Sequence, residues 1–208
     1  MDGVFMKKFV VRLGFCLILA AVFWCGTLIS DAQRLREELI RLHVVANSDS
    51  LADQALKLRV RDAVTDSLRQ ELQNAGDAER AKQYIQEKLP YIQQVAENTL
   101  KAMGCDETVT VRLCREAFDT RIYETFTLPA GIYNSLRIII GQGQGQNWWC
   151  VVFPEFCIPA TSEGFHHVAA GAGFPEELNG ALSAEEGYEL RFGILDFMGK
   201  METLLLEG

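Results

Sequence analysis

The chain has 208 residues, with 20 Lys and Arg against 28 Asp and Glu, which gives a formal net charge of −8. That length suits one domain plus a targeting segment and is too short for two full hydrophobic cores. Apolar residues run throughout the sequence, so it is not typical of a disordered protein. No basic stripe follows the N-terminus, which argues against a nucleic-acid-binding protein, because phosphate contacts need clustered Lys and Arg.

Residues 1–32 are predicted to be a targeting segment. Cations at Lys7, Lys8 and Arg12 precede an uncharged, mostly apolar run over 13–29. This order is typical of a signal peptide or a signal anchor, and the run is near the short limit for a membrane-spanning helix, roughly 17 residues. Ser30-Asp31-Ala32 resembles a cleavage site, so release and anchoring both stay open, with a buried core helix as the less favoured alternative. Residues 33–208 are then expected to form the exported domain.

The next segments alternate between strand and helix. Residues 39–46 alternate apolar and polar side chains, which predicts a strand. Ser50 and Asp53 have the spacing of a helix start, and the helix that follows should end at 74–76. A second, long amphipathic helix is predicted from Asp77 to Gly104, and Pro90 should kink or break it.

The second half of the chain is predicted to supply the remaining strands. Residues 108–113 alternate as a strand does, and a second extended piece is expected at 121–127. Pro129-Ala130-Gly131 is interpreted as the start of a short helical turn, before a buried strand at 137–140. That strand and the apolar run 148–153 flank a glycine-rich loop, which predicts a hairpin.

The last fifty residues give weaker signals. Residues 159–187 are rich in Gly, Ala and Glu without a steady period, which we interpret as a flexible surface excursion. A strand end at 188–192 and an amphipathic helix after it are expected to close the domain. The predicted fold is therefore a single compact α/β domain, with helices packed on a mixed sheet of four or five strands. The first strand–helix unit and the tryptophan hairpin should be neighbours, because both carry apolar faces that need covering.

The glycine-rich loop does not have the pattern of a nucleotide site. Gly141, Gly143 and Gly145 are spaced G-x-G-x-G, and the segment that follows is strand-like. A dinucleotide site needs a helix N-terminus at that point to hold the pyrophosphate. A hairpin loop is the favoured interpretation, and no cofactor is predicted.

Histidines and carboxylates offer two weak chemical hypotheses. His43 beside Asp49 could act as a general base, although a hydrogen-bonded structural histidine is favoured. Asp49 and Asp53 lack the spacing of a calcium loop, so helix capping explains them better. No cysteine or histidine spacing fits zinc, and His166-His167 is interpreted as solvated loop, so no metal site is predicted.

The exported cysteines and the paired tryptophans are the remaining features. Cys105 and Cys114 bracket a strand and would lie about 30 Å apart, too far for a disulfide. Cys150 and Cys157 flank a proline that could turn the chain, so this pair is favoured if any disulfide forms within the domain, and unpaired buried thiols are an equal alternative. Trp148 and Trp149 should face opposite sides of their strand, which leaves one ring towards solvent or a partner.

Two long stretches resemble stage II sporulation protein R. They are R-L-H-V-V-A-N-S-D-S-x-x-D-Q-A-L-K-L-x-V-R-D-A-V over 41–64, and P-A-G-x-Y-x-x-L-R-I-I-I-G-x-G-x-G-x-N-W-W-C-V-V-F-P-x-x-C over 129–157. Together they cover about a quarter of the chain. Residues 159–187 match no motif of that family.

The resemblance implies a non-enzymatic signalling protein of endospore formation. It would be exported from the forespore into the intermembrane space, secreted or held by its N-terminal segment. There it would activate a membrane-embedded aspartic protease of the mother cell, which processes the sigma-E precursor. The alternatives are a secreted hydrolase acting on cell-wall material, with His43 and an acidic partner, and a structural scaffold protein.

The same motifs supply candidates for a functional surface, since no catalytic residues are carried over from the family. These candidates are His43, Asn47, Asp49, Asp53, Gln54, Arg61, Asp62, Gly141, Gly143, Asn147, Trp148 and Trp149.

Overall fold

The computed structural model describes residues 3–122, 127–154 and 199–201, and it divides into two compact units, Met1–Arg34 and Leu35–Gly208. Helix α1 (Gly3–Glu38) contains all of the described first unit and extends into the second. Within the described ranges, no helix is both long enough and apolar enough to span a membrane. The membrane anchor is therefore not confirmed, and the targeting role of residues 1–32 stays a prediction.

The first strand and helix of the second unit form where the sequence predicts them. Strand β1 covers Ile40–Val45 and helix α2 covers Leu51–Gln73. The Ser50 hydroxyl accepts a hydrogen bond from the Asp53 backbone N–H at 3.1 Å, so it caps the helix N-terminus. Asn74 caps the other end, and Gly76 follows with φ of +77°.

Helix α3 (Ala78–Ala102) begins at an Asp77 cap and is followed by Gly104. It runs without a break through Pro90, so of the predicted kink or break the break is wrong, and the kink stays a prediction. Pro90 lies on the exposed side of an amphipathic helix, where water can satisfy the carbonyl that loses its backbone donor. Packing of the opposite, buried side keeps the helix in one piece.

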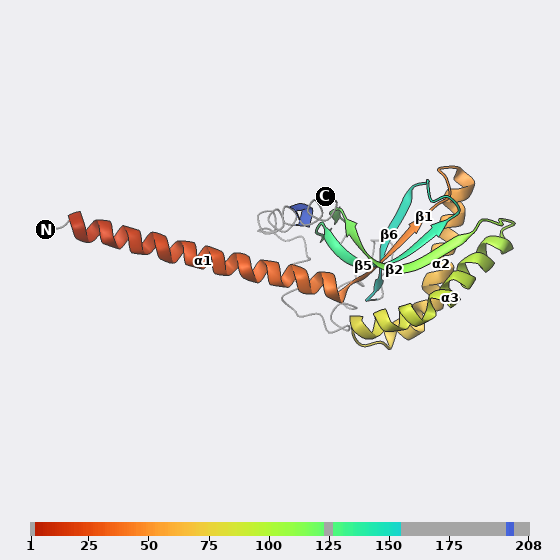
Figure 1. The fold of residues 1–208 in the computed structure, drawn as a ribbon, viewed down its shortest axis with the longest axis horizontal. Helices are drawn as coiled ribbons and strands as arrows, with labels where there is room; N and C mark the ends of the chain where they lie inside the picture. Colours follow the sequence, from red (N-terminus) through yellow and green to blue (C-terminus); the bar gives the residue numbers. More distant parts are fainter. Residues whose placement is uncertain (1–2, 123–126, 155–198, 202–208) are drawn as a thin grey trace. The chain divides into compact units, whose positions relative to one another are not determined.

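Four strands form a mixed sheet in the order β2-β5-β1-β6 (Figure 1). Strand β1 is central and pairs in parallel with β5 (Gly131–Ile140) and antiparallel with β6 (Asn147–Phe153). Strand β2 (Val109–Phe118) pairs antiparallel with the whole of β5. A separate two-stranded ladder joins β3 (Arg121–Ile122) to β4 (Thr127–Leu128).

Two predictions for this region are wrong. Strands β5 and β6 do not form a hairpin, because β1 lies between them and pairs with both. The segment after Pro129 is not a helical turn, since β5 already begins at Gly131. The expected proximity of the first strand–helix unit and the tryptophan strand is confirmed by the direct pairing of β1 and β6.

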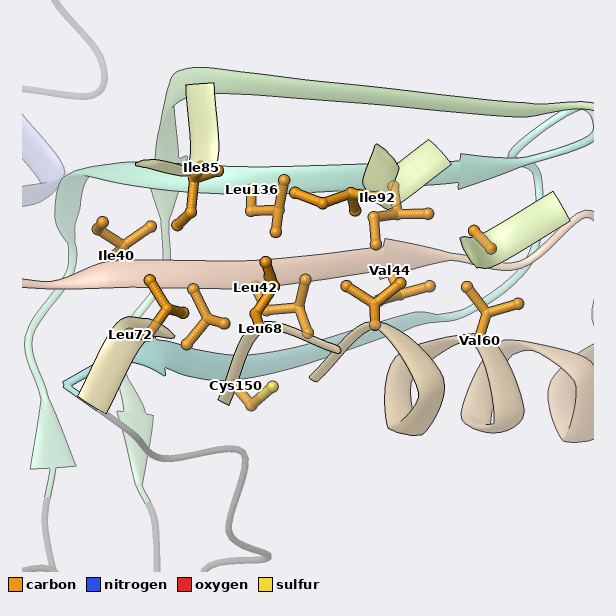
Figure 2. Close-up of a cluster of buried hydrophobic side chains, with 14 of the residues drawn as sticks. Ile40, Leu42, Val44, Val60, Leu68, Leu72, Ile85, Ile92, Leu136 and Cys150 are labelled. Carbon is orange, nitrogen blue, oxygen red and sulfur yellow. The ribbon is translucent and has the colours of Figure 1, made fainter. Parts of the chain in front are cut away.

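The hydrophobic core lies between one face of the sheet and the two helices α2 and α3 (Figure 1). Alternate residues of the central strand, Ile40, Leu42 and Val44, are fully buried there. Figure 2 shows them beside Leu68 of α2 and Ile92 of α3. We call this side of the sheet the helix-covered face and the other side the opposite face.

Some predictions fall on residues that are not described. The excursion at 159–187, the strand end at 188–192 and most of the terminal helix lie outside the described residues. Cys105 and Cys114 are both free thiols, as their predicted separation requires. Cys150 is disulfide-bonded, but Cys157 lies outside the described residues, so that pairing stays a prediction.

Candidate functional site

The glycine loop, residues 141–146, crosses the end of β1 to connect the two strands that flank it. Asn47, just after β1, fastens this loop from both its side chain and its backbone. The Asn47 Oδ1 accepts from the Gln142 N–H at 2.9 Å, and its backbone carbonyl accepts from the Gln144 N–H at 3.1 Å. The loop is thus held on the strand end by ordinary hydrogen bonds, with Gly141 and Gly143 at positive φ of 55° and 63°.

Two charged side chains hold the last residue of the glycine loop. The Asp49 carboxylate accepts from the Gln146 N–H at 2.6 Å, and the Lys57 ammonium donates to the Gln146 carbonyl at 2.8 Å. Lys57 also donates to the side-chain oxygen of Gln54. Burial, opposed by the Asp49 charge and aided by that of Arg61, lowers the pKa of Lys57 from its usual range.

Asp53 and Gln54 tie the β1–α2 turn to the first turn of α2. The Asp53 carboxylate accepts from the Ser48 hydroxyl and from the Asn47 amide, and Gln54 donates to the Ser48 carbonyl at 2.9 Å. The Ser48 hydroxyl bond lowers the pKa of Asp53; burial opposes this effect, and the bonds of Asn47 and Ser50 add to it. These residues therefore shape the strand-to-helix corner.

A second group of polar residues lies on the opposite face of the sheet. The His43 Nδ1 is 3.0 Å from both carboxylate oxygens of Glu116, and the Arg137 Nη1 donates to the same carboxylate at 2.9 Å. His43 is only 3% exposed. Burial favours the neutral acid, but the His43 hydrogen bond and the charges of His43 and Arg137 outweigh it, so the pKa of Glu116 is lowered.

Aromatic rings enclose the His43 imidazole. Trp149 stacks on it with ring centroids 3.6 Å apart and planes 20° apart, and Phe118 meets it edge-on at 6.5 Å. The Arg41 guanidinium, from the same strand as His43, lies 3.9 Å from the Phe118 ring centroid. The His43 Nε2 is buried and has no hydrogen-bond partner within the described part of the chain.

The other tryptophan lies on the helix-covered face, as the alternation of strand residues predicts. Trp148 is partly buried against the core, and the Arg61 guanidinium of α2 lies 4.2 Å from its ring centroid. Arg61 also pairs with the neighbouring Asp62 at 2.6 Å. Both tryptophans are partly buried, and a ring facing a partner stays a prediction.

The predicted surface residues thus fall into three groups. Asn47, Asp49, Asp53, Gln54, Gly141 and Gly143 lie at the end of β1; Arg61, Asp62 and Trp148 lie at the helix-covered face; His43 and Trp149 lie on the opposite face. Asn147, the first residue of β6, is exposed beside Val45.

His43 does not pair with Asp49, which instead fixes the glycine loop. The carboxylate that reaches His43 is Glu116, 73 residues away. Sequence reasoning missed Glu116, Arg137 and Lys57. One signal could have pointed to Glu116. It is an acidic residue in β2, a strand whose residues alternate between more and less buried positions.

Comparison with known proteins finds a family match, and it spans all three groups of candidate residues. The family model described as stage II sporulation protein R matches residues 36–163. The chain belongs to the stage II sporulation protein R family. The matched residues include all four strands of the main sheet, both of its helices and every candidate surface residue.

A curated relative, stage II sporulation protein R of Bacillus subtilis (strain 168), is 38% identical over 128 residues. The match covers 62% of this chain and 57% of the relative, so the chain aligns with little more than half of that protein. No solved structure matches the chain.

Proposed function

We propose that this protein is an exported signal between the two compartments of a sporulating cell. It leaves the forespore by means of residues 1–32 and acts in the intermembrane space. Its partner there is a membrane-embedded aspartic protease of the mother cell, which it activates to process the sigma-E precursor. It acts by binding, without catalysing a reaction itself.

The family match carries this proposal, because it covers the whole main sheet and both helices that pack on it. The geometry supports it in a second way. Asn47, Asp49 and Lys57 use their side-chain hydrogen bonds to hold the glycine loop in one place. A binding scaffold needs such a rigid loop. A rigid loop and a strand carrying two tryptophans present a defined surface at low entropic cost.

Reconstitution in a vegetative, non-sporulating cell tests the proposal. The chain, the membrane protease and the sigma-E precursor are produced together, and precursor cleavage is followed by immunoblot. Cleavage that needs both the protease and the intact chain, and fails with a chain lacking residues 1–32, is the expected result. A folded and exported chain that leaves the precursor uncut would contradict the proposal.

One observation favours a secreted hydrolase as the second candidate. His43 and Glu116 form a buried imidazole–carboxylate pair of the kind that orients a general base. However, Trp149 covers one face of the imidazole. Release of soluble fragments from purified cell walls, abolished by His43→Ala, would favour this candidate, and an equal absence of fragments from parent and variant would count against it.

A further inference from the structure

One row of side chains crosses the whole opposite face of the sheet. Strand register places Arg112 of β2 opposite Arg137 of β5, Arg137 opposite His43 of β1, and His43 opposite Trp149 of β6. Directly paired residues of neighbouring strands point to the same face. The row Arg–Arg–His–Trp therefore spans three strand spacings, about 14 Å.

The row carries more positive than negative charge. Arg112 and Arg137 are direct cross-strand neighbours, and like charges in that position repel each other. Glu116 compensates part of this charge, but its carboxylate is already engaged by His43 and Arg137. Within the described residues, exposed Arg112 forms no ion pair.

A further arginine extends the positive charge beyond the tryptophan. The Arg121 guanidinium lies 5.7 Å from the Trp149 ring centroid, and Arg121 is exposed without an ion pair in the described part of the chain. We call Arg112, Arg121, Arg137 and Trp149 the arginine–tryptophan surface. Its charge contrasts with the net charge of −8 of the whole chain.

We propose that the arginine–tryptophan surface binds an acidic, extended segment of a protein partner; the proposal rests on the proposed function, in which that partner is the membrane protease. Arg112 lies at one end of the row and Arg121 lies beside Trp149 at the other end, and each of these exposed arginines can receive a carboxylate in bidentate geometry. Arginine and tryptophan are also the residues that most often dominate binding energy at interfaces. Two carboxylates about four or five residues apart on an extended segment would match the 14 Å row.

The chain offers a matched control on the same strand. Arg115 is exposed like Arg112, but it is three residues along β2 and so points to the other face. The variants Arg112→Glu and Arg115→Glu change the net charge equally. Only the first places a carboxylate on the arginine–tryptophan surface.

The test uses the full chain with the membrane protease and the sigma-E precursor in vegetative cells, at equal exported levels of each variant. We expect Arg112→Glu to slow precursor cleavage about tenfold or more, and Arg115→Glu to change it less than about twofold. Arg121→Glu, a second variant on the same surface, should also slow cleavage. It replaces Arg112→Glu in the test if that variant is poorly exported. A photocrosslinker at position 110, an exposed site two residues from Arg112 on the same face of β2, should attach to a protease segment that contains Asp or Glu, and one at 115 should not.

The results separate this inference from the proposed function. If the parent chain and all three variants trigger cleavage equally, the arginine–tryptophan surface does not bind the partner, and the signalling role stands. If the crosslink from position 110 maps to a segment without carboxylates, the proposed acidic chemistry is wrong. If the parent chain itself triggers no cleavage, both proposals fail.

Discussion

At the scale of single residues, Glu116 offsets part of the positive charge on the opposite face of the sheet. It accepts hydrogen bonds from His43 and Arg137, and its pKa lies below the ordinary value of 4.5 in the folded chain. A carboxyl whose pKa is lowered by folding stabilises the protein above its ordinary pKa. That stabilisation is lost as the pH falls through the lower pKa of the folded state.

We expect Glu116→Gln to reduce the free energy of unfolding at pH 7 by about 1–3 kcal/mol, because two charge-assisted hydrogen bonds weaken. The difference between parent and variant should shrink as the pH falls from the ordinary carboxyl pKa of 4.5 through the lower pKa of the folded state, because the parent carboxylate is then protonated. Chemical denaturation at several pH values measures both effects. Glu87→Gln, at an exposed site on α3, is the control. A difference that stays constant down to pH 2 would contradict this role for Glu116.

Gly141 gives a second prediction at this scale. Its φ of +55° is unfavourable for other residues, and an added Cβ would meet the side chains of Asn47 and Glu107. Gly141→Ala should therefore cost about 1–2 kcal/mol of stability. Gln142→Ala, an exposed change in the same loop, should stay within about 0.5 kcal/mol of the parent. Equal melting temperatures for the two variants would show that the loop relaxes freely.

At the scale of elements, Pro90 is a built-in weakness of α3. It lies on the exposed side of an otherwise continuous helix and cannot donate a backbone hydrogen bond. Pro90→Ala should raise the free energy of unfolding by about 1–3 kcal/mol, since alanine restores the donor and favours the helix. Thermal denaturation of the two chains measures the gain. A lower melting temperature in the variant would mean that Pro90 makes a stabilising contact of its own.

Short-range sequence patterns predicted β1, α2 and α3, because capping residues and strand alternation set the ends of these elements. Ser50 and Asp77 have cap spacing, Asn74 and Gly104 mark helix ends, and the alternation over 39–46 marks a strand, so β1, α2 and α3 lie close to their expected ranges. The hairpin failed for a physical reason. Two apolar strands joined by a glycine loop can pair with each other, or they can pair with the two edges of a third strand that lies between them. Only the long-range contact with β1 decides between them.

The candidate site shows the same division. The Ser50 cap and the opposite orientation of Trp148 and Trp149 follow from spacing, and both were predicted. Helix capping by Asp49 and Asp53 was also predicted and is wrong, because their carboxylates hold the glycine loop and the β1–α2 turn instead. The partners of His43 and of Gln146 come from distant elements. Glu116 reaches His43 across β5, and Lys57 reaches the loop from α2. The sequence around these residues does not predict such contacts, because the tertiary arrangement of strands and helices creates them.

At the scale of the whole molecule, the proposed role depends on the compartment in which the domain acts. Residues 1–32 precede the compact second unit, and the family match begins after them, at residue 36. We therefore expect this segment to deliver the domain without taking part in protease activation. An unrelated secretion signal should be able to replace it.

That replacement is the most direct test of the central claim. Three chains are compared in vegetative cells that contain the membrane protease and the sigma-E precursor: the parent, a chain lacking residues 1–32, and a chain carrying an unrelated cleaved secretion signal in their place. We expect precursor cleavage with the first and third chains and none with the second. Cleavage by the chain that stays in the cytosol, or none by an exported and folded third chain, would contradict the claim that this domain signals from outside the membrane.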